Sequence, residues 1–442
     1  MKVVIAVHHF PPRYTGGAEW ETYRIASTLR ARGHEVHVIC VERIDAGQAE
    51  GVSWTDEIYN DLPVRRLSYN LAAAPDPVRW EYDNLWIGEH LERYLDEIQP
   101  DIFHLISGYL ISGRALHVAH DLGIPSVVSL MDFWFLCRRI SMLRSDGQVS
   151  PLPIRAADCA RCLAEERRLY RWPATIAPAL ADIYWRGQRE KIRPVEARAE
   201  FLRQALELAD TIISRSHFVQ SVFTQAGVGG DRFVFSRQGR DFPDMPDPVP
   251  APPASPVLRV GYLGQIAWHK GVHVLFEAAR QLPNAQMTVQ AYGDLTPFPA
   301  YTARLRKLSA QDSRLELMGS RGQQDLGEVL RNLDVLVVPS LWYENSPNVM
   351  LEAFAHHTPV IASNLGGMTE LVQDGTNGLL FAPGDAGSLA RQLRRLLDEP
   401  ALLPALRRAN TAVRSVAEEI DELGAIYRRV VSARRPEPLI EA

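Results

Sequence analysis

Two acidic side chains, Glu344 and Glu352, stand eight residues apart in a stretch whose pattern could place both beside one ligand. The apolar run Val335–Val338 is typical of a buried parallel strand that ends in a loop. Ser346 and Pro347 favour a helix start, because a serine oxygen can cap the first turn and proline suits the first helical position. The stretch therefore predicts a strand, a loop and a helix, and ligands of open α/β sheets bind at the carboxyl ends of strands.

The spacing of the two glutamates predicts that they address different parts of an elongated ligand. Glu344 is expected in the loop, while Glu352 is expected about a turn and a half inside the helix, where each residue advances by about 1.5 Å. Between them, the first amides of the helix, those of Asn348, Val349 and Met350, would point out of the N-terminus and suit a phosphate. A sugar, a diphosphate and a ribose would match this order. The competing interpretation is that both glutamates are solvated surface residues.

The start of the chain has a similar pattern. Lys2–Val7 predicts a buried strand, and the loop after it contains Gly16 and Gly17. A helix is expected over about Trp20–Arg32 and a second strand over Val36–Val41. Paired glycines let a backbone approach a ligand closely. Their spacing differs from the G-x-G-x-x-G fingerprint, so no NAD site is expected.

Strands and helices alternate along the rest of the chain, which predicts parallel sheets. Further strands are expected over 126–130, 258–263, 287–292, 315–318 and 360–362, and further helices over 84–98, 218–224 and 416–433. Seven prolines between Pro243 and Pro256 predict a stiff, extended linker. A chain of 442 residues exceeds what one core normally supports, so we expect two domains separated by this linker.

The composition excludes several classes of protein. A net charge of −5 argues against general nucleic-acid binding. No apolar run reaches the roughly 18 residues that a membrane span needs, and the opening MKVVIAVHHF lacks the cleavage site of a signal peptide. Four cysteines are few for this length and suit a reducing compartment. These features predict a cytoplasmic location.

Several motifs follow Glu344 in close order. Seven residues separate it from Glu352, and HTPVIAS, GGMTELV and NGLLF come next. Together they resemble the retaining glycosyltransferases of family 4. That family has an α/β fold of the GT-B type, in which two Rossmann-like parallel-sheet domains face a cleft. His357 stands where the family usually has glycine.

The resemblance implies a division of the chain. An N-terminal acceptor-binding Rossmann-like domain would span 1–242, with a helical insertion at about 155–203. A C-terminal Rossmann-like domain that binds the nucleotide-sugar would span 257–415, and a helix over 416–442 would cross back to the N-terminal domain.

The resemblance also implies roles for residues of the second domain. Glu344 would contact sugar hydroxyls, and Glu352 would hold the ribose. The segment GQIAWHKG is similar to the family's G-R-x(4)-K-G, in which both basic residues neutralise the diphosphate. Lys270 keeps its place, while Gln265 replaces the arginine and brings no charge. Asn348 and Val349 would supply amides to the donor phosphates.

In the first domain, the family's GGAE-type loop meets the donor phosphate and the acceptor, which implies binding roles for Gly16, Gly17 and Glu19. The family's His-Asp pair after a strand is Met131-Asp132 here. Methionine offers no useful hydrogen bond, so one sugar contact is missing, while Asp132 remains a candidate catalytic residue beside Glu344 and Lys270.

The function implied by the resemblance is that of a retaining, nucleotide-sugar-dependent hexosyltransferase of polysaccharide biosynthesis. Its acceptor would be a cell-envelope glycan or a lipid-linked intermediate. No cofactor and no divalent metal are expected. Two alternatives stay open. The chain could be a catalytically silent GT-B protein that binds a partner, which Met131 and Gln265 favour, or another GT-B enzyme, an epimerase or a phosphorylase.

Three cysteines, Cys137, Cys159 and Cys162, follow Asp132. The last two form a C-x-x-C pair that can chelate zinc, but a structural zinc site needs four ligands. Cys40 lies in an expected strand, so we expect free thiols in a loop and no metal.

Residues 155–203 carry eleven Arg or Lys against seven Asp or Glu, together with Tyr170, Trp172, Tyr184 and Trp185. One interpretation is a helical insertion with a solvated face. The other is contact with an anionic membrane surface or a lipid-linked acceptor, which would make the protein peripheral at the inner membrane face.

Overall fold

A computed structural model describes residues 1–45, 49–242, 255–322, 325–409 and 412–434. The chain divides into two compact units. Unit 1 holds Met1–Asp146, Ser150–Arg237 and the last helix, and unit 2 holds Gly147–Val149 and Gln238–Ser415. The expected proline-rich linker lies mostly outside the described residues, at 243–254.

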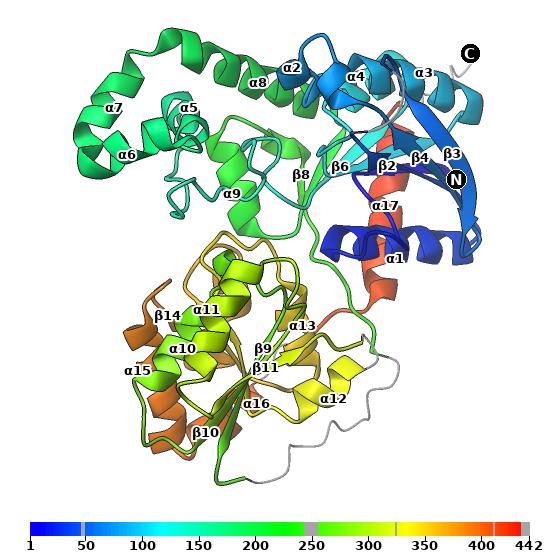
Figure 1. Cartoon of the computed structure of the whole chain (residues 1–442). Coiled ribbons are helices and arrows are strands. Elements are labelled where there is room, and N and C mark those ends of the chain that lie inside the picture. Colours follow the sequence, from blue (N-terminus) through cyan, green and yellow to red (C-terminus); the bar gives the residue numbers. More distant parts are fainter. Residues whose placement is uncertain (46–48, 243–254, 323–324, 410–411, 435–442) are drawn as a thin grey trace. The chain divides into compact units, whose positions relative to one another are not determined.

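Unit 1 is built on an eight-stranded sheet with the order β3-β4-β2-β1-β5-β6-β7-β8 (Figure 1). The strands are β1 Lys2–Val7, β2 Glu35–Arg43, β3 Ser53–Tyr59, β4 Leu62–Ser68, β5 Ile102–Ile106, β6 Ser126–Leu130, β7 Thr211–Ser214 and β8 Phe233–Phe235. All neighbours pair in parallel except β3 and β4. The expected α/β architecture with a parallel sheet is confirmed for the centre of the unit.

The β3–β4 hairpin departs from the expectation of parallel strands throughout. Its two-residue turn is Asn60-Asp61, and both residues have positive φ, 46° and 65°. Asn and Asp tolerate this conformation, and turns with two such residues match the twist of a hairpin. The pair Asn60-Asp61 was the local signal for this turn.

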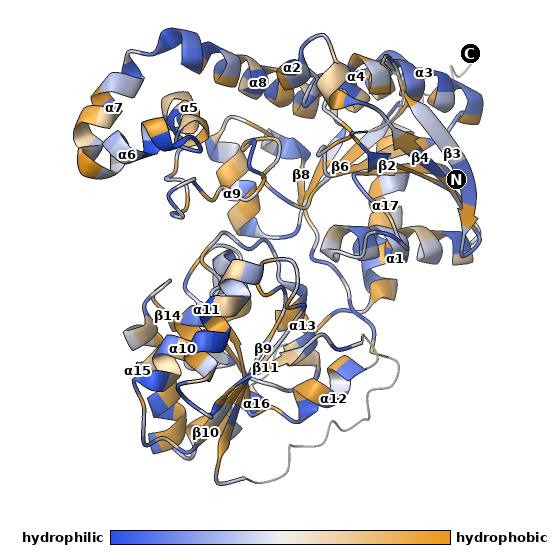
Figure 2. Ribbon diagram, in the orientation of Figure 1, coloured by the Kyte–Doolittle hydropathy of each residue, from blue (hydrophilic) through white to orange (hydrophobic). Residues whose placement is uncertain are grey.

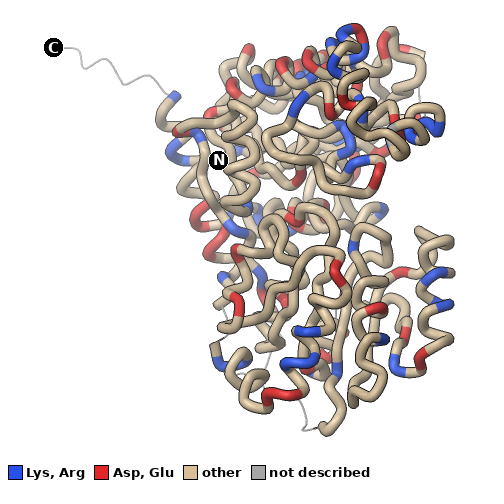
Figure 3. The backbone as a smooth tube through the Cα atoms, turned by 90° about the vertical axis from the view of Figure 1, so that its left-hand side faces the viewer, with Lys and Arg blue, Asp and Glu red and all other residues tan. Residues whose placement is uncertain are grey.

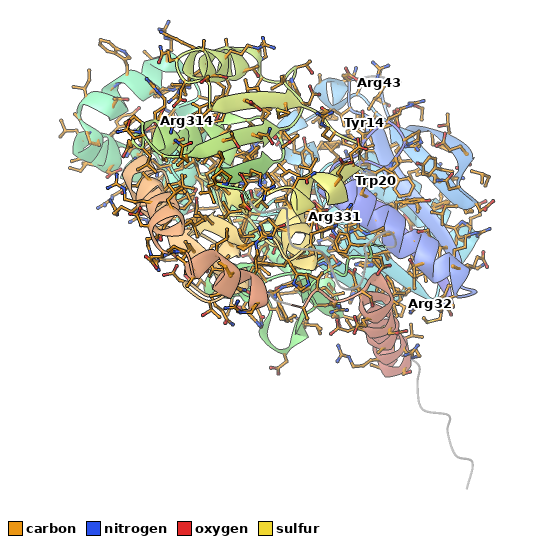
Figure 4. All side chains as sticks on the ribbon, turned by 90° about the horizontal axis from the view of Figure 1, so that it is seen from below. Tyr14, Trp20, Arg32, Arg43, Arg314 and Arg331 are labelled. Atoms are coloured by element: carbon orange, nitrogen blue, oxygen red, sulfur yellow. The ribbon has the colours of Figure 1, made fainter. Side chains whose placement is uncertain are left out.

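Helices cover the sheet of unit 1. They are α1 Gly17–Ala31, α2 Pro77–Trp80, α3 Leu85–Ile98, α4 Arg114–Asp121, α5 Ala156–Ala164, α6 Arg168–Ile176, α7 Pro178–Arg186, α8 Arg189–Leu208, α9 His217–Gln225 and α17 Val416–Arg434. The last of these packs into the core formed by α1, β1 and β2. Arg32, at the end of α1, donates to Asp421 of α17 at 2.7 Å (Figure 4).

The expected insertion at about 155–203 is helical, and its helices α5 to α8 form an arm of unit 1. Figure 1 shows α6 and α7 at the end of this arm farthest from the sheet. Trp185 anchors the arm, because it is buried with Ala160 of α5 and Ile192 of α8. Figure 3 shows basic and acidic positions interspersed along unit 1.

Unit 2 is built on a six-stranded parallel sheet with the order β11-β10-β9-β12-β13-β14. The strands are β9 Leu258–Leu263, β10 Met287–Tyr292, β11 Leu315–Gly319, β12 Val335–Val338, β13 Val360–Ser363 and β14 Gly378–Phe381. The helices are α10 Val272–Arg280, α11 Pro299–Ser309, α12 Leu326–Arg331, α13 Asn348–Ala355, α14 Met368–Leu371, α15 Ala386–Asp398 and α16 Leu402–Arg408. Figure 2 shows the strands largely hydrophobic, while the surrounding helices carry hydrophilic positions.

Candidate active site

Lys270 and Glu344 follow the two strands at which the strand order of unit 2 reverses. β9 begins this unit and lies between β10 and β12, so successive crossovers run to opposite sides of it. Ligands of open α/β sheets bind outside the carboxyl ends of strands at such a point. Lys270 ends a short 3-10 turn after β9, and Glu344 lies in the loop after β12.

Gly271 allows these two loops to pack together. Its φ is +75°, and a Cβ at this position would lie 1.9 Å from the carbonyl oxygen of Pro339. Only glycine combines that conformation with so close an approach. The amide of Leu341 donates to the carbonyl oxygen of His269 at 2.8 Å and joins the loops. The Lys-Gly pair therefore places the Lys270 side chain at the end of β12.

One carboxylate oxygen of Glu344 accepts three hydrogen bonds. Its Oε1 receives Nζ of Lys270 at 2.7 Å, Oγ of Ser340 at 2.7 Å and Nε1 of Trp342 at 2.6 Å. The Lys270 ammonium also lies 4.6 Å from the centre of the Trp342 ring. Within the described residues, Oε2 of Glu344 accepts no hydrogen bond, so it is available to a ligand hydroxyl.

The charge state of Glu344 follows from these contacts. Burial by itself would raise the pKa of this carboxyl, but the charge of Lys270 and the hydrogen bonds from Lys270, Trp342 and Ser340 outweigh it. The pKa of Glu344 therefore lies below its usual value of 4.5. Burial, aided by Lys270, lowers the pKa of the neighbouring His269 to about 4, so that imidazole is neutral at neutral pH.

The Gly366-Gly367 turn packs against the loop that carries Glu344 and supports it. The amide of Gly367 donates to the carbonyl oxygen of Glu344 at 2.8 Å. A Cβ on Gly367 would lie 1.7 Å from the carbonyl oxygen of Asn345, so a larger residue would push the loop away. The paired glycines after β13 thus position the loop that carries the carboxylate.

Helix α13 begins at Asn348, and the expected serine cap is wrong. Pro347 takes the N-cap position with an extended backbone, ψ 118°, so helical geometry starts one residue later and the Ser346 side chain caps nothing. The Met350 amide donates to the carbonyl oxygen of Pro347 at 3.1 Å. The amides of Asn348 and Val349 find no acceptor among the described residues. Two of the three expected amides are therefore available to an anion.

Glu352 is buried on α13 and pairs with Arg240 at 2.6 Å. Gln238, two residues before that arginine, donates Nε2 to the carbonyl oxygen of Ser346 at 2.7 Å and to Oδ1 of Asn348 at 3.1 Å. The segment before the proline-rich stretch therefore places a cation, the Arg240 side chain that is 12% exposed, beside α13. Any ligand of Glu352 has to share the carboxylate with Arg240.

Gln265 is exposed, and its side chain contacts neither Lys270 nor Glu344 by a hydrogen bond. Among the described residues only its carbonyl oxygen is engaged, by the hydroxyl of Tyr262 at 2.7 Å and the amide of Ala267 at 2.9 Å. The residue in the place of the family's arginine therefore lies outside the cluster in this state of unit 2.

A second polar cluster lies in unit 1, at the ends of β1, β5 and β6. His8 follows β1, and its Nε2 lies 3.5 Å from Oε1 of Glu19 on α1. Asp132 follows β6 and accepts from Oγ of Ser107 at 2.7 Å and from the Trp134 amide at 2.8 Å. Burial raises the pKa of Asp132, although Ser107, the Trp134 amide and His8 oppose the shift.

The expected glycines belong to this second cluster. Gly16 is the N-cap of α1, and Gly17 is its first residue. A Cβ on Gly16 would lie 2.6 Å from Oε2 of Glu19. Met131 is half-buried and packs against the core beside Asp132.

The structure thus brings Lys270 together with Glu344 and sets Asn348, Val349 and Glu352 on the adjacent helix. Sequence analysis missed Ser340, Trp342 and Arg240, and it missed His8 in unit 1. A signal existed for each of them, since all four are polar groups in the loops that follow strand ends. Their partners, however, lie on other elements.

The three cysteines are free thiols, but the expected loop is wrong for two of them, because Cys159 and Cys162 lie on α5. Burial raises the pKa of Cys137, and it raises that of Cys159 to about 12. Over the described ranges, no three His, Cys, Asp or Glu side chains gather in a way that could hold a metal ion.

Comparison with known families decides the relationship. Residues 16–239 match the family model described as Glycosyl transferase 4-like domain, which is half of the chain, and residues 257–399 match the model described as Glycosyl transferases group 1. The chain belongs to the family 4 glycosyltransferases. The expectation from the motifs around Glu344 is therefore confirmed.

Some relatives and solved structures similar to this glycosyltransferase cover nearly its whole length. Glycogen synthase of Mycobacterium tuberculosis is 25% identical over 443 residues, which cover 95% of this chain and 91% of that protein. Among solved structures, sucrose-phosphate synthase from Thermosynechococcus elongatus has a TM-score of 0.67 at 20% identity and covers 98% of this chain and 99% of its own. Anabaena HepE in complex with UDP has a TM-score of 0.65 at 18% identity and covers 97% of this chain and 100% of its own. These neighbours confirm the GT-B fold.

In the part of this glycosyltransferase that the structure describes, no helix combines the length and the apolar character that crossing a membrane requires.

Proposed function

We propose that this family 4 glycosyltransferase transfers a sugar from a nucleotide-sugar donor to a hydroxyl group, with retention of the anomeric configuration. The observation that carries the proposal is the Lys270–Glu344 pair, 2.7 Å apart beside the unpaired amides of Asn348 and Val349. A cation, two amides and an ionised carboxylate with one unoccupied oxygen are what a diphosphate and a sugar require. HepE, whose structure contains UDP, has the same fold.

The proposed chemistry needs no carboxylate nucleophile. The bond between the anomeric carbon and the diphosphate oxygen breaks, and the acceptor oxygen bonds to that carbon on the same face. The acceptor proton passes to a diphosphate oxygen. Lys270 and the start of α13 stabilise the negative charge that grows on the diphosphate, which is the largest contribution that such a site makes. Glu344 orients the sugar through Oε2, and Asp132 and Glu19 are proposed to meet the acceptor.

Thermal-shift measurements with UDP, GDP and ADP sugars test the donor class, because a bound ligand raises the melting temperature by mass action. We expect one base to give a clear rise that Lys270→Ala removes, with Arg304→Ala, an exposed cation on α11, as the control. NMR of the product then reports the anomer. No rise with any nucleotide-sugar, or a product of inverted configuration, would contradict the proposal.

The acceptor is proposed to be a cell-envelope glycan or a lipid-linked intermediate, reached from the inner membrane face. The support is the outer surface of α6 and α7. Five large apolar side chains there are between 67% and 76% exposed: Leu169, Trp172, Ile176, Leu180 and Ile183. Their helical spacing gives each helix an exposed apolar stripe, and Arg167 and Arg168 stand at the start of α6. Such helices lie in the headgroup region of an anionic bilayer.

Flotation with anionic vesicles tests this attachment. Each basic residue near the surface contributes about 1 kcal/mol, so we expect binding that weakens at high salt and after Arg167→Glu with Arg168→Glu. Trp172→Glu with Ile183→Glu should abolish it at any salt. Ile58→Glu is the control, since Ile58 is 69% exposed on β3. If the wild-type protein fails to float at low salt, the arm does not bind membranes.

A further inference from the structure

A cavity of about 590 Å³ lies in unit 1, between α5, α8 and the segment that follows β6. Its lining includes none of Glu19, Asp132 or the residues of unit 2 described above. Small-molecule sites commonly measure about 300–1,000 Å³. The arm therefore encloses a space of ligand size that the sugar-transfer chemistry does not use.

The wall of this cavity is predominantly apolar. Phe135, Leu136, Ile154, Leu163 and Val195 line it together with the three thiols. Because burial raises the pKa of Cys159 to about 12, that thiol is neutral at physiological pH. Neutral thiols behave as small hydrophobic groups. The wall thus suits a hydrocarbon rather than a sugar.

Charged side chains also line the cavity, and Arg198 is the buried one among those that the structure describes there. It lines the cavity and is only 7% exposed. Its Nη2 donates to the carbonyl oxygen of Trp134, and its guanidinium lies 5.2 Å from the centre of that indole ring. Its Nε has no hydrogen-bond partner, and no carboxylate among the described residues pairs with it.

The other arginines of the wall pair with carboxylates, while the exposed Lys191 lies against aromatic rings. Arg138 pairs with Glu81, and Arg203 pairs with Glu200 at 2.7 Å and with Glu207. Burial lowers the pKa of Arg198 to about 10, so its guanidinium is still charged at neutral pH. A buried charge without a counterion is costly, and a bound anion recovers that cost.

We propose that the cavity binds an amphiphile, with an anionic phosphate head against Arg198 and a hydrocarbon tail along the apolar wall. This inference deepens the proposed function and rests on it for the idea that the bound molecule is the acceptor or its lipid carrier. A buried guanidinium is suited to a phosphate, because its planar set of donors matches phosphate oxygens. The cavity lies in the arm that carries the exposed apolar stripes. It is lined by α5 and α8, the helices that precede and follow the striped helices α6 and α7.

Calorimetry with three probes tests the site: decyl phosphate below its micelle concentration, inorganic phosphate and 1-decanol. We expect one decyl phosphate per chain, bound at least tenfold more tightly than either other probe. Equal affinity for inorganic phosphate would indicate a simple phosphate site, and equal affinity for 1-decanol would indicate a simple apolar cavity. Either result overturns the proposal.

Two variants and a matched control locate the binding. Arg198→Met should reduce the affinity for decyl phosphate by roughly tenfold to a hundredfold, as expected for a lost charged hydrogen bond, and leave that for 1-decanol unchanged. Leu163→Trp should fill the cavity and weaken both. Arg193→Met, the same change at an exposed arginine of α8 outside the cavity lining, should alter neither. The melting temperature of each variant shows whether it folds. If Arg198→Met does not fold, Leu163→Trp still tests whether the ligand binds in this cavity.

These measurements need no donor and no turnover. If decyl phosphate fails to bind while nucleotide-sugars raise the melting temperature, the inference is wrong and the proposed function stands. If decyl phosphate binds as expected but no nucleotide-sugar does, the cavity is an amphiphile site and the proposed function is wrong.

Discussion

At the scale of single residues, the carboxylates of unit 2 are held by cations that come from distant parts of the chain. Lys270 is 74 residues from Glu344, and Arg240 is 112 residues from Glu352. Each pair orients the carboxylate before a ligand arrives, which lowers the cost of binding. Glu344 and Glu352 have different neighbours and different proposed ligand groups. We therefore predict that substituting them affects different steps.

Glu352→Gln should weaken the binding of the free nucleoside diphosphate by roughly tenfold to a hundredfold, because a hydrogen bond to a charged group contributes about 1.5–3 kcal/mol. Calorimetry measures the affinity. The substitution also leaves Arg240 without its anion, so stability must be measured in parallel. Arg240→Gln is the control, since it breaks the same pair and keeps the carboxylate. If Glu352→Gln binds the nucleoside diphosphate with unchanged affinity, Glu352 does not bind the ribose.

Glu344→Gln should reduce turnover at least tenfold while free nucleotide binding changes little, because its proposed partner is the sugar. Lys270 and the hydrogen bonds to Glu344 hold the pKa of this carboxyl below its usual value, so it stays ionised to a lower pH than an unpaired glutamate does. We therefore expect any acid loss of turnover from this group to begin at a lower pH than an unpaired glutamate would give. Trp342→Phe, which removes one donor and keeps the ion pair, is the control. A loss of nucleotide binding with intact turnover would reverse the two roles.

At the scale of elements, the residue that follows α13 has a backbone conformation that its side chain disfavours. His357 follows the helix with φ 54°, in the left-handed region, and its side chain is exposed. Helices commonly end with glycine at this position, because a Cβ there is disfavoured. The glycine that the family usually has is explained by this conformation, and the departure at His357 affects stability rather than the carboxylates.

His357→Gly should raise the free energy of unfolding by about 0.5–1 kcal/mol. Relief of the left-handed strain, about 1–2 kcal/mol, exceeds the extra entropy of glycine in the unfolded chain, about 0.5–1 kcal/mol. Urea denaturation measures the change. Ala355→Gly, in the last turn of the same helix, should instead destabilise by up to about 1 kcal/mol. A destabilised His357→Gly variant would mean that the imidazole makes a favourable contact.

At the scale of the whole molecule, helix α17 near the end of the chain packs into the core of unit 1, which the first strands and helices build. Tyr427 of α17 is fully buried, and its hydroxyl lies 2.7 Å from Nδ1 of His104 on β5. Arg215, after β7, forms a buried network with Glu21 of α1 and Glu419 of α17. The core of unit 1 is therefore complete only when α17 is in place.

Tyr427→Ala should lower the free energy of unfolding by about 3–5 kcal/mol, as expected for a large aromatic side chain removed from a packed core. Denaturation followed by circular dichroism measures it. Arg429→Ala, an exposed position on the same helix, should change stability by less than about 0.5 kcal/mol. Equal effects in the two variants would show that α17 is not part of the cooperative unit.

The sequence by itself determined the elements and the family. β1, β9, β10 and β12 have the expected bounds, because apolar runs and turn residues act within about ten residues of chain. The motifs around Glu344 identified the family for the same reason, since they lie within one strand-loop-helix unit. The β3–β4 hairpin was missed although its turn signal is local.

Only the tertiary structure decided which side chains share a site. Strand order places β9 beside β12, and that adjacency joins Lys270 to Glu344. The pairing of Arg240 with Glu352 and the cavity around Arg198 likewise depend on segments far apart in the chain. Spacing along the sequence carries no information on such contacts, because they arise from how the packed layers bring distant loops together.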